Sequence, residues 1–350
     1  MNETLIQIIW LAVKVGFAVM FGLNIAGLLG WVERKQSAVM QDRVGANRAD
    51  IFGITILGLF HPIADALKML TKEDFVPAKV HKPFHGLAPV IALGFGMLCL
   101  AALPFGGTVS VAGRLWDLQP IASPVSLLFV LGLLSIGVHG IVMAGYASGS
   151  NYGLLGGLRA AAQMISYEVC LGAALAGAMF IYGTLDLQQA VIWQGHLIHG
   201  WLPAWGIFLQ PLGFILFLTA GAAVTKRTPF DLPEGESEIV GYHVEYSGMK
   251  FGMFLMTDFI ESIVISGIIV AVFLGGWQIP YVQLTGLVGG VLMVVSFSVK
   301  TLFILLLLMQ IRWTLPRFRF DQVLDLGWKN ILPLCLLNFI VTVWGVYLWR

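Results

Sequence analysis

Long runs of apolar residues dominate this sequence and set the narrowest limits on its fold. Eight of them are long enough to cross a membrane, which takes roughly 20 mainly apolar residues. They cover residues 5–31, 84–103, 124–146, 160–182, 202–224, 251–274, 282–311 and 328–349. Only 11% of the residues are charged while 58% are hydrophobic, which excludes an ordinary soluble domain. We predict an all-α integral membrane protein, a bundle of about eight transmembrane helices.

The basic residues predict the orientation of this bundle. Of the 20 lysines and arginines, Arg114 and Arg350 fall in loops on one side and Lys14 and Lys300 within spans, which leaves sixteen on the other side. Basic loops remain on the inner face of a membrane. Both termini are therefore expected outside, and the first run is too long for a signal-peptide core. We expect a single membrane domain, 1–350, with inner-side functional segments at 33–82, 225–250 and 312–329.

The first inner segment contains an apolar stretch at residues 51–70. Asp50 is a plausible N-cap, and Pro62 falls in the middle of the stretch. Asp65 and Lys68 are three residues apart and would share one side of a helix. The pattern predicts a kinked amphipathic helix that lies at the membrane interface or against the bundle.

Glu168 is an acidic residue deep within a predicted span. It follows Arg159 by nine residues, which places it about 14 Å into the membrane at 1.5 Å per residue. Carboxylates at such depth usually mark ion or proton paths, because they are costly to bury otherwise. The alternative is a neutral, hydrogen-bonded structural acid.

Two further acids, Asp258 and Glu261, lie three residues apart on one face of another span. Two carboxylates this close should titrate as a coupled pair. Lys300 lies about 18 Å inside its own span, twelve residues before Arg312. Lys300 is therefore a candidate partner for one of these acids.

The second inner segment reads TKRTPFDLPEGESEIVGYHVEYS over residues 225–247. Its acids are Asp231, Glu234, Glu236, Glu238 and Glu245. An ordinary solvated acidic loop would explain them. Proline, isoleucine, valine and aromatic residues are interleaved with the acids, however, which favours a folded, partly buried element that handles protons through raised carboxyl pKa values.

The seven histidines give no sign of a haem or metal site. Only His139 lies clearly within a span, and no pair is placed as haem ligands would be. We expect no redox cofactor or metal on this chain, so that any electron transfer would use a cofactor on a partner.

Five inner-side motifs together resemble one family. They read ERKQSAVMQDRVGANR (33–48), PIADALKMLTKED (62–74), GGLRAAAQMISYE (156–168), TKRTPFDLPEGESEIVGYHVEYSG (225–248) and LPRFRFDQVLDLGWK (315–329). In this order, and over nearly the whole chain, they are similar to the H-type subunit, also called subunit 1, of the proton-pumping NADH:quinone oxidoreductase, respiratory complex I.

The resemblance implies eight transmembrane helices, an outer N-terminus and a place in the membrane arm beside the peripheral arm, in a bacterial inner (plasma) membrane. Quinone, ubiquinone or menaquinone, would be the substrate, and FMN and iron–sulfur clusters would belong to partner subunits. Peripheral-arm iron–sulfur and quinone-site subunits, antiporter-like subunits and small membrane subunits would be the partners, with no nucleic acid. It implies a quinone chamber lined or supported by Glu33, Arg34, Arg43, Asp65, Lys68, Glu73 and Phe230.

The resemblance also implies a chain of acids that leads from this chamber to the proton-pumping subunits. Its members would be Glu168, Glu234, Glu236, Glu238 and Glu245, and we add the intramembrane acids Asp258 and Glu261.

The sequence departs from the family pattern at several of these places. Ala46, His61 and Ala66 replace a usual proline, glutamine and glycine, while Val224, Lys226 and Asp258 replace glutamate, asparagine and glutamate. Glu261 has no clear counterpart, and one residue is missing between Val240 and Gly241. Two alternative functions stay open: the homologous membrane anchor of a proton-pumping hydrogenase or formate-oxidising complex, and a stand-alone ion or solute transporter.

Overall fold

The computed structural model describes residues 3–111, 114–198, 200–233, 235, 238–239, 241–282 and 286–349. Seven helical segments within these ranges are long and apolar enough to cross a membrane. They are Leu5–Met40, Lys82–Ala101, Ser126–Ala147, Asn151–Tyr182, Gly248–Phe273, Gly286–Thr314 and Phe320–Leu348. The prediction of a multi-pass helical membrane protein is confirmed.

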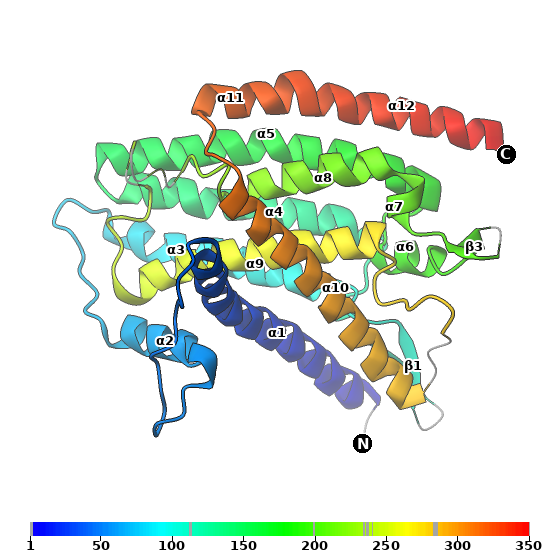
Figure 1. Ribbon diagram of the computed structural model, residues 1–350, viewed down its shortest axis with the longest axis horizontal. Helices are drawn as coiled ribbons and strands as arrows, with labels where there is room; N and C mark the ends of the chain where they lie inside the picture. The colour runs from blue at the N-terminus through cyan, green and yellow to red at the C-terminus, as the bar shows by residue number, and fades with distance from the viewer. Residues whose placement is uncertain are drawn as a thin grey trace.

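These segments belong to the main helices of the bundle (Figure 1). The long helices are α1 (Glu3–Met40), α3 (Lys82–Ala101), α4 (Ser126–Ala147), α5 (Asn151–Tyr182), α9 (Gly248–Phe273), α10 (Gly286–Thr314) and α12 (Leu332–Trp349). Shorter ones are α2 (His61–Thr71), α6 (Leu187–Trp193), α7 (Gly206–Leu209), α8 (Pro211–Val224) and α11 (Phe320–Asp325). A π-helical turn, Leu326–Ile331, joins α11 to α12.

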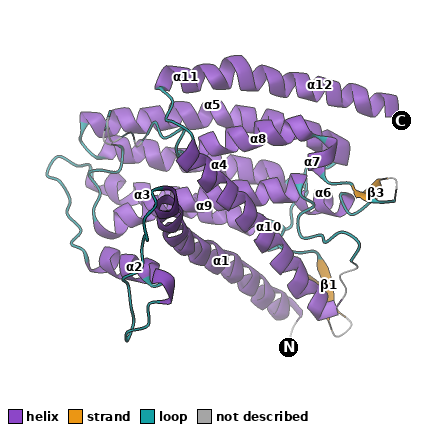
Figure 2. Ribbon diagram, viewed as in Figure 1, coloured by secondary structure: helices purple, strands orange, loops and turns teal. Residues whose placement is uncertain are grey.

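Strands are confined to two short hairpins in the loops of the described chain (Figure 2). The first pairs β1 (Thr108–Val111) with β2 (Arg114–Asp117), and the second pairs β3 (Leu197–Ile198) with β4 (Leu202–Pro203), both antiparallel. In Figure 1 both chain ends lie toward the end of the bundle opposite α2. The two termini therefore share one side, and their assignment to the outer side stays a prediction.

Helix α9 forms the centre of the bundle. It packs against α1, α3, α8 and α10. In its most apolar stretch of 18 residues, 83% of the residues are buried, against 11% in the corresponding stretch of α1. Glycine and alanine let neighbouring helices approach closely, as is common in membranes. At Gly140 on α4, for example, an added Cβ would lie 2.6 Å from the backbone nitrogen of Ala92 on α3. The position of α9 explains why charged residues on it are withdrawn from solvent and lipid.

The fifth predicted span, 202–224, is not one continuous helix. Its first residues form β4, and α7 and α8 are separated at Gln210, whose backbone is not helical. Pro211 explains the break, because proline disfavours the helical conformation of the residue before it. The Gln210 side chain accepts a hydrogen bond from Asn338 (3.0 Å) and donates one to Thr342, both on α12, which ties the break to that helix.

The predicted amphipathic helix is shorter than expected. Residues 51–60 form turns and a 3-10 turn (Ile56–Gly58), and α2 begins only at His61. The prediction of a kinked helix that starts at an Asp50 cap was therefore wrong. Pro62 starts the helix, because a first-turn residue needs no backbone N–H. Ile63, Leu67 and Leu70 are more than half exposed along α2. The helix therefore has the exposed apolar face that the sequence predicted.

Candidate functional site

A charged cavity of about 260 Å³ lies where α1, α2, α9 and α10 meet the loop after α8. Its charged lining residues are Glu33, Arg34, Asp65, Lys226, Arg227, Asp231, Asp258 and Arg312. Apolar side chains, among them Met69, Leu255 and Phe259, complete the wall. The structure thus brings together four residues from distant predicted segments, Glu33, Arg34, Asp65 and Asp258.

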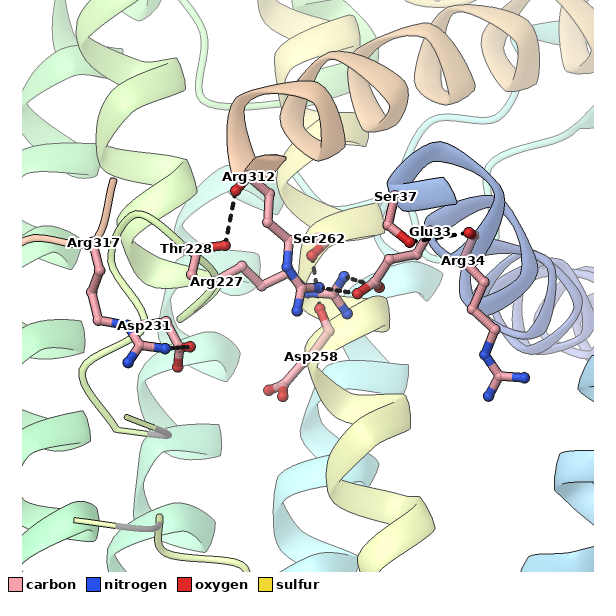
Figure 3. A network of polar contacts seen from close by, with 10 residues as sticks. All are labelled: Glu33, Arg34, Ser37, Arg227, Thr228, Asp231, Asp258, Ser262, Arg312 and Arg317. Atoms are coloured by element: carbon pink, nitrogen blue, oxygen red, sulfur yellow. Dashed lines mark hydrogen bonds and ion pairs between the residues drawn. The ribbon is translucent and has the colours of Figure 1, made fainter. Parts of the chain in front are cut away.

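Glu33 lines this cavity and contacts two arginines (Figure 3). Its Oε1 is 2.6 Å from Nη1 of Arg312, and its Oε2 is 3.2 Å from Nη1 of Arg227. The guanidinium of Arg227 also lies 3.9 Å from the centroid of the Phe259 ring, a favourable cation–π contact. One carboxylate thereby joins α1, α10 and the loop after α8.

Arg34 and Asp65 form a second ion pair at the rim, with 2.6 Å between Nη2 and Oδ2. Their side chains are 48% and 38% exposed, so water screens the pair and it contributes at most about 1 kcal/mol to stability. Its clearer effect is to tie α2 to α1 beside the cavity.

Phe230 is buried beside the cavity and is not part of its lining. Its ring centroid lies 5.6 Å from that of Phe318 and 5.8 Å from that of Tyr167. Gln163 donates a hydrogen bond of 2.8 Å to its carbonyl oxygen. These contacts fix the start of the 225–247 segment against α5.

Asp231 follows on the same segment and pairs with Arg317, with 2.9 Å between Oδ2 and Nη2 (Figure 3). Its other oxygen, Oδ1, is buried and has no hydrogen-bond partner in the part of the chain that the structure describes. Burial raises the pKa of the Asp231 carboxyl, against the opposing charges of Arg317 and Arg312, and the negative charge of Asp258 raises it further.

This raised pKa predicts how Asp231 affects stability with pH. An unfolded aspartate titrates near pH 3.9, so the contribution of Asp231 is favourable below that pH and is lost as the pH rises through the higher folded pKa. We expect the Tm of Asp231→Asn relative to the natural protein to rise as the pH increases above about 4. Thermal unfolding of the purified protein measures it, with Asp325→Asn at an exposed ion pair as control. A difference that does not change with pH would contradict the prediction.

Lys226 is the partner of the two acids on α9. Its Nζ lies 2.8 Å from Oδ1 of Asp258 and 3.2 Å from Oε2 of Glu261. The lysine side chain is fully buried, and those of the two acids are 7% and 4% exposed. Lys226 has a positive φ of 54°, which is strained for a residue with a side chain. The two acids therefore lie on either side of one buried cation, and their coupled titration stays a prediction.

The prediction that Lys300 pairs with one of these acids was wrong. Its ammonium donates to the backbone carbonyls of Leu274, Gly276 and Gln278 at 2.7–3.0 Å, after the far end of α9. Those carbonyls lie at or beyond the last turn of the helix, where oxygens lack intrahelical partners. The sequence pattern placed Lys226 in a charged inner loop, and only its departure from the family pattern indicated its importance.

Glu168 lies at the middle of α5, away from the charged cavity. Ser135 on α4 donates a hydrogen bond of 2.7 Å to its Oε2. Together with His139 and apolar residues, Glu168 lines a second cavity of about 710 Å³ between α3, α4 and α5. Its Oε1 is buried without a hydrogen-bond partner among the described residues. One acceptor of the Glu168 carboxyl group is thus left unsatisfied within the described chain.

The remaining predicted acids are spread over the same end of the protein. Glu238 pairs with Arg159 at 2.8 Å and is 42% exposed. Glu245 is half-buried, and its carbonyl oxygen lies 3.3 Å from Nε2 of His85. Glu234 and Glu236 lie outside the described residues, as does Val240 beside the one-residue gap.

Three of the predicted chamber residues are exposed and lie outside the cavity lining, namely Arg43, Lys68 and Glu73. Arg43 donates hydrogen bonds to Gln41 and Ser37, and the carbonyl of Glu73 accepts one from Ser247. The sequence did not single out Arg227, Arg312 or Arg317 for this site. Their position in basic loops was the available signal, but loops on this face hold many basic residues.

These features define a multi-pass helical membrane protein with a mixed-charge cavity at one end of its bundle and buried acids leading into its interior. The chain belongs to the NADH dehydrogenase family, whose family model matches residues 12–343.

Curated relatives cover the chain almost completely, and all three named here are H-type subunits of NADH-quinone oxidoreductase. The one from Bdellovibrio bacteriovorus is 40% identical, over 92% of each chain. One from Geobacter sulfurreducens is 42% identical, over 98% of each chain. The one from Thermomicrobium roseum is 43% identical, over 93% of each chain.

Proposed function

We propose that this chain is the membrane subunit of a bacterial NADH:quinone oxidoreductase, respiratory complex I, which forms one wall of the quinone chamber and couples quinone reduction to proton translocation. The observation that carries the proposal is the charged cavity, where the first, second and fourth motifs meet. The names of the three relatives all refer to a quinone, which favours this function over a hydrogenase anchor or a stand-alone transporter.

The cavity has the chemistry that a quinone requires. Apolar side chains such as Met69 and Phe259 suit an isoprenoid tail, and the few charged groups suit the polar head. Reduction takes two electrons and two protons, and negative charge develops on the two carbonyl oxygens. Arg227 and Arg312, which line the cavity and contact Glu33 there, would stabilise that charge. The electrons would come from iron–sulfur clusters on peripheral-arm partners, with FMN as their source.

The buried acids extend from this cavity into the bundle. Asp231 and Asp258 line it, Asp258 and Glu261 share Lys226, and Glu168 lies beyond them on α5. Glu234, Glu236, Glu238 and Glu245 belong to the same proposed path through the 225–247 segment. Such a series would carry the electrostatic effect of quinone chemistry to membrane-arm partners that move protons.

Replacing Glu168 by glutamine tests this function. The change keeps the shape and a hydrogen bond from Ser135 but removes a group that can bind and release a proton. We expect proton pumping by the assembled complex to fall at least about tenfold, while NADH-driven quinone reduction continues. Losing a positioned proton-transfer group usually costs about 100-fold or more, so tenfold is a lower limit. Dye quenching in sealed vesicles measures pumping.

Ser135→Ala provides the matched control, since it removes the hydrogen-bond donor and leaves the carboxyl group, and it should affect pumping less. Normal pumping by an assembled Glu168→Gln complex would refute the coupling part of the proposal.

A further inference from the structure

The chain between α1 and α2 carries a run of exposed apolar side chains. Residues 51–60 read IFGITILGLF and include no charged residue. Phe52 is fully exposed, and its apolar neighbours are 41–68% exposed, namely Ile51, Ile54, Ile56 and Leu57. Single apolar residues on a surface need no explanation, but a contiguous group marks an interaction site. Residues 51–57 are referred to here as the apolar loop.

Phe52 is presented at the tip of a tight turn. Ile51 and Ile54 exchange backbone hydrogen bonds of 3.0 and 3.2 Å, which close a two-residue turn around Phe52 and Gly53. Both of these residues have a positive φ, 52° and 81°, as a type I′ turn requires. Glycine adopts this conformation readily, whereas a bulky side chain is strained in it. A strained, fully exposed phenylalanine gives the described fold no stability, which points to a contact with another molecule.

Contacts at the base of the apolar loop hold it in place. The indole nitrogen of Trp31 on α1 donates a hydrogen bond of 3.1 Å to the carbonyl oxygen of Leu57. Nδ1 of His61 lies 2.8 Å from the carbonyl oxygen of Gly58. Gly58 also packs on the backbone of Ala46, where an added Cβ would lie 2.0 Å from the carbonyl oxygen. The loop is thus shaped before it meets a partner, so that binding by its tip requires little further ordering.

The contact with Trp31 also gives the level of the apolar loop in the membrane. Trp31 ends the first apolar run, residues 5–31, and tryptophan is enriched where a membrane meets water. In Figure 1 the dark blue chain between α1 and α2 projects past α2, across the direction of α5 and α9 and not along it. The apolar loop therefore leaves the bundle sideways, at the level of the lipid headgroups.

The surroundings of the apolar loop favour lipid over a protein partner. Apolar surface continues along the chain into α2, where Ile63, Leu67 and Leu70 are exposed. Two exposed cations, Arg48 and Lys68, lie on either side of the loop in sequence. An apolar tip with flanking cations matches the boundary between acyl chains and anionic headgroups.

We propose that the apolar loop inserts into the membrane leaflet on the charged side of the bundle and anchors α2 there, with anionic phospholipids as its partner. Asp65 and Met69 of α2 line the charged cavity, so the anchor also fixes one wall of that cavity relative to the lipid. The inference does not depend on the proposed function, because it requires only that the bundle spans a membrane.

Spin labels on the assembled complex in lipid nanodiscs test the anchor, because oxygen concentrates among acyl chains while a nickel chelate stays in water. Phe52→Cys and Ile54→Cys carry the label in the loop. Asp42→Cys is the matched control, since Asp42 is also exposed and also has a positive φ, 50°. We expect oxygen to relax the labels at 52 and 54 more strongly than the nickel chelate does, and the reverse at 42.

The native thiols and the headgroup charge are tested in the same samples. The three cysteines of this chain are buried, and the complex without an introduced cysteine gives the background from all native thiols. The oxygen preference of the label at 52 should weaken when phosphatidylcholine replaces phosphatidylglycerol. Arg48→Gln should weaken it similarly in phosphatidylglycerol.

Stronger relaxation by the nickel chelate at both loop positions would place the loop in water and overturn the anchor. Labels shielded from both reagents would show that a protein partner covers the loop, which also overturns it. An oxygen preference that is unchanged in phosphatidylcholine would overturn the role of anionic headgroups. None of these measurements is an activity, so their outcome is separable from the pumping assay of Glu168→Gln.

Discussion

Replacing Glu33 by alanine is expected to lower kcat/KM for quinone reduction by roughly 30-fold, equivalent to about 2 kcal/mol. The change removes the carboxylate that now contacts Arg227 at 3.2 Å and Arg312 at 2.6 Å. Without it the two guanidinium groups repel each other and should move from the positions from which they would stabilise the quinone's negative charge. Deleting one such electrostatic contact costs roughly 3 kcal/mol of transition-state stabilisation, so a displaced contact should cost about 2 kcal/mol.

Assay of NADH-driven quinone reduction in purified complexes measures this effect. Glu33→Asp keeps the charge and should retain most of the activity, while the double variant Glu33→Ala with Arg312→Ala removes one uncompensated cation and should recover part of it. Asp321→Asn changes an exposed acid outside the cavity and serves as control. A natural kcat/KM in Glu33→Ala would show that the arginine pair does not act on the quinone.

Replacing Gly140 by alanine should destabilise the bundle by about 2 kcal/mol, a typical cost of overpacking. The added Cβ would meet backbone atoms of α3, 2.6 Å from the Ala92 nitrogen and 2.9 Å from the Ala88 carbonyl oxygen. Because both atoms belong to a helix backbone, neither can rotate away, and α3 and α4 must separate.

The same substitution at Gly132 gives a matched control on the same helix. Nothing lies within 4 Å of its Cβ position, so alanine should be neutral or stabilise α4 by up to about 1 kcal/mol. Thermal unfolding in detergent should therefore show a lower Tm for Gly140→Ala and an equal or higher Tm for Gly132→Ala. Equal Tm values for the two variants would contradict the close packing of α3 and α4.

The long apolar helices could be predicted because a membrane imposes one local requirement. Every backbone polar group must find its partner within the segment, so length and hydropathy alone locate most spans. The fifth span shows where this reasoning ends. Its composition is mainly apolar, but Pro211 breaks the helix, and the Gln210 side chain at the break bonds to α12, a contact between segments that are distant in sequence.

The candidate site divides in a similar way. The family resemblance placed Glu33, Arg34 and Asp65 among the candidate functional residues, and the rarity and cost of charges within apolar runs placed the acids of α9 there. It did not assign their partners. Lys300 and Lys226 both lie near apolar runs, and nothing in their local sequence says that one binds helix-end carbonyls and the other two carboxylates.

The sequence by itself therefore determined the helical membrane class and the charged face, since these follow from local composition, and the family resemblance supplied most of the candidate site residues. The tertiary structure alone decided which charges meet. Pairing depends on how α1, α8, α9 and α10 cross, and small residues at the helix contacts set those crossings far from the charges in sequence. The central position of α9 is what turns three scattered charged residues into one buried centre.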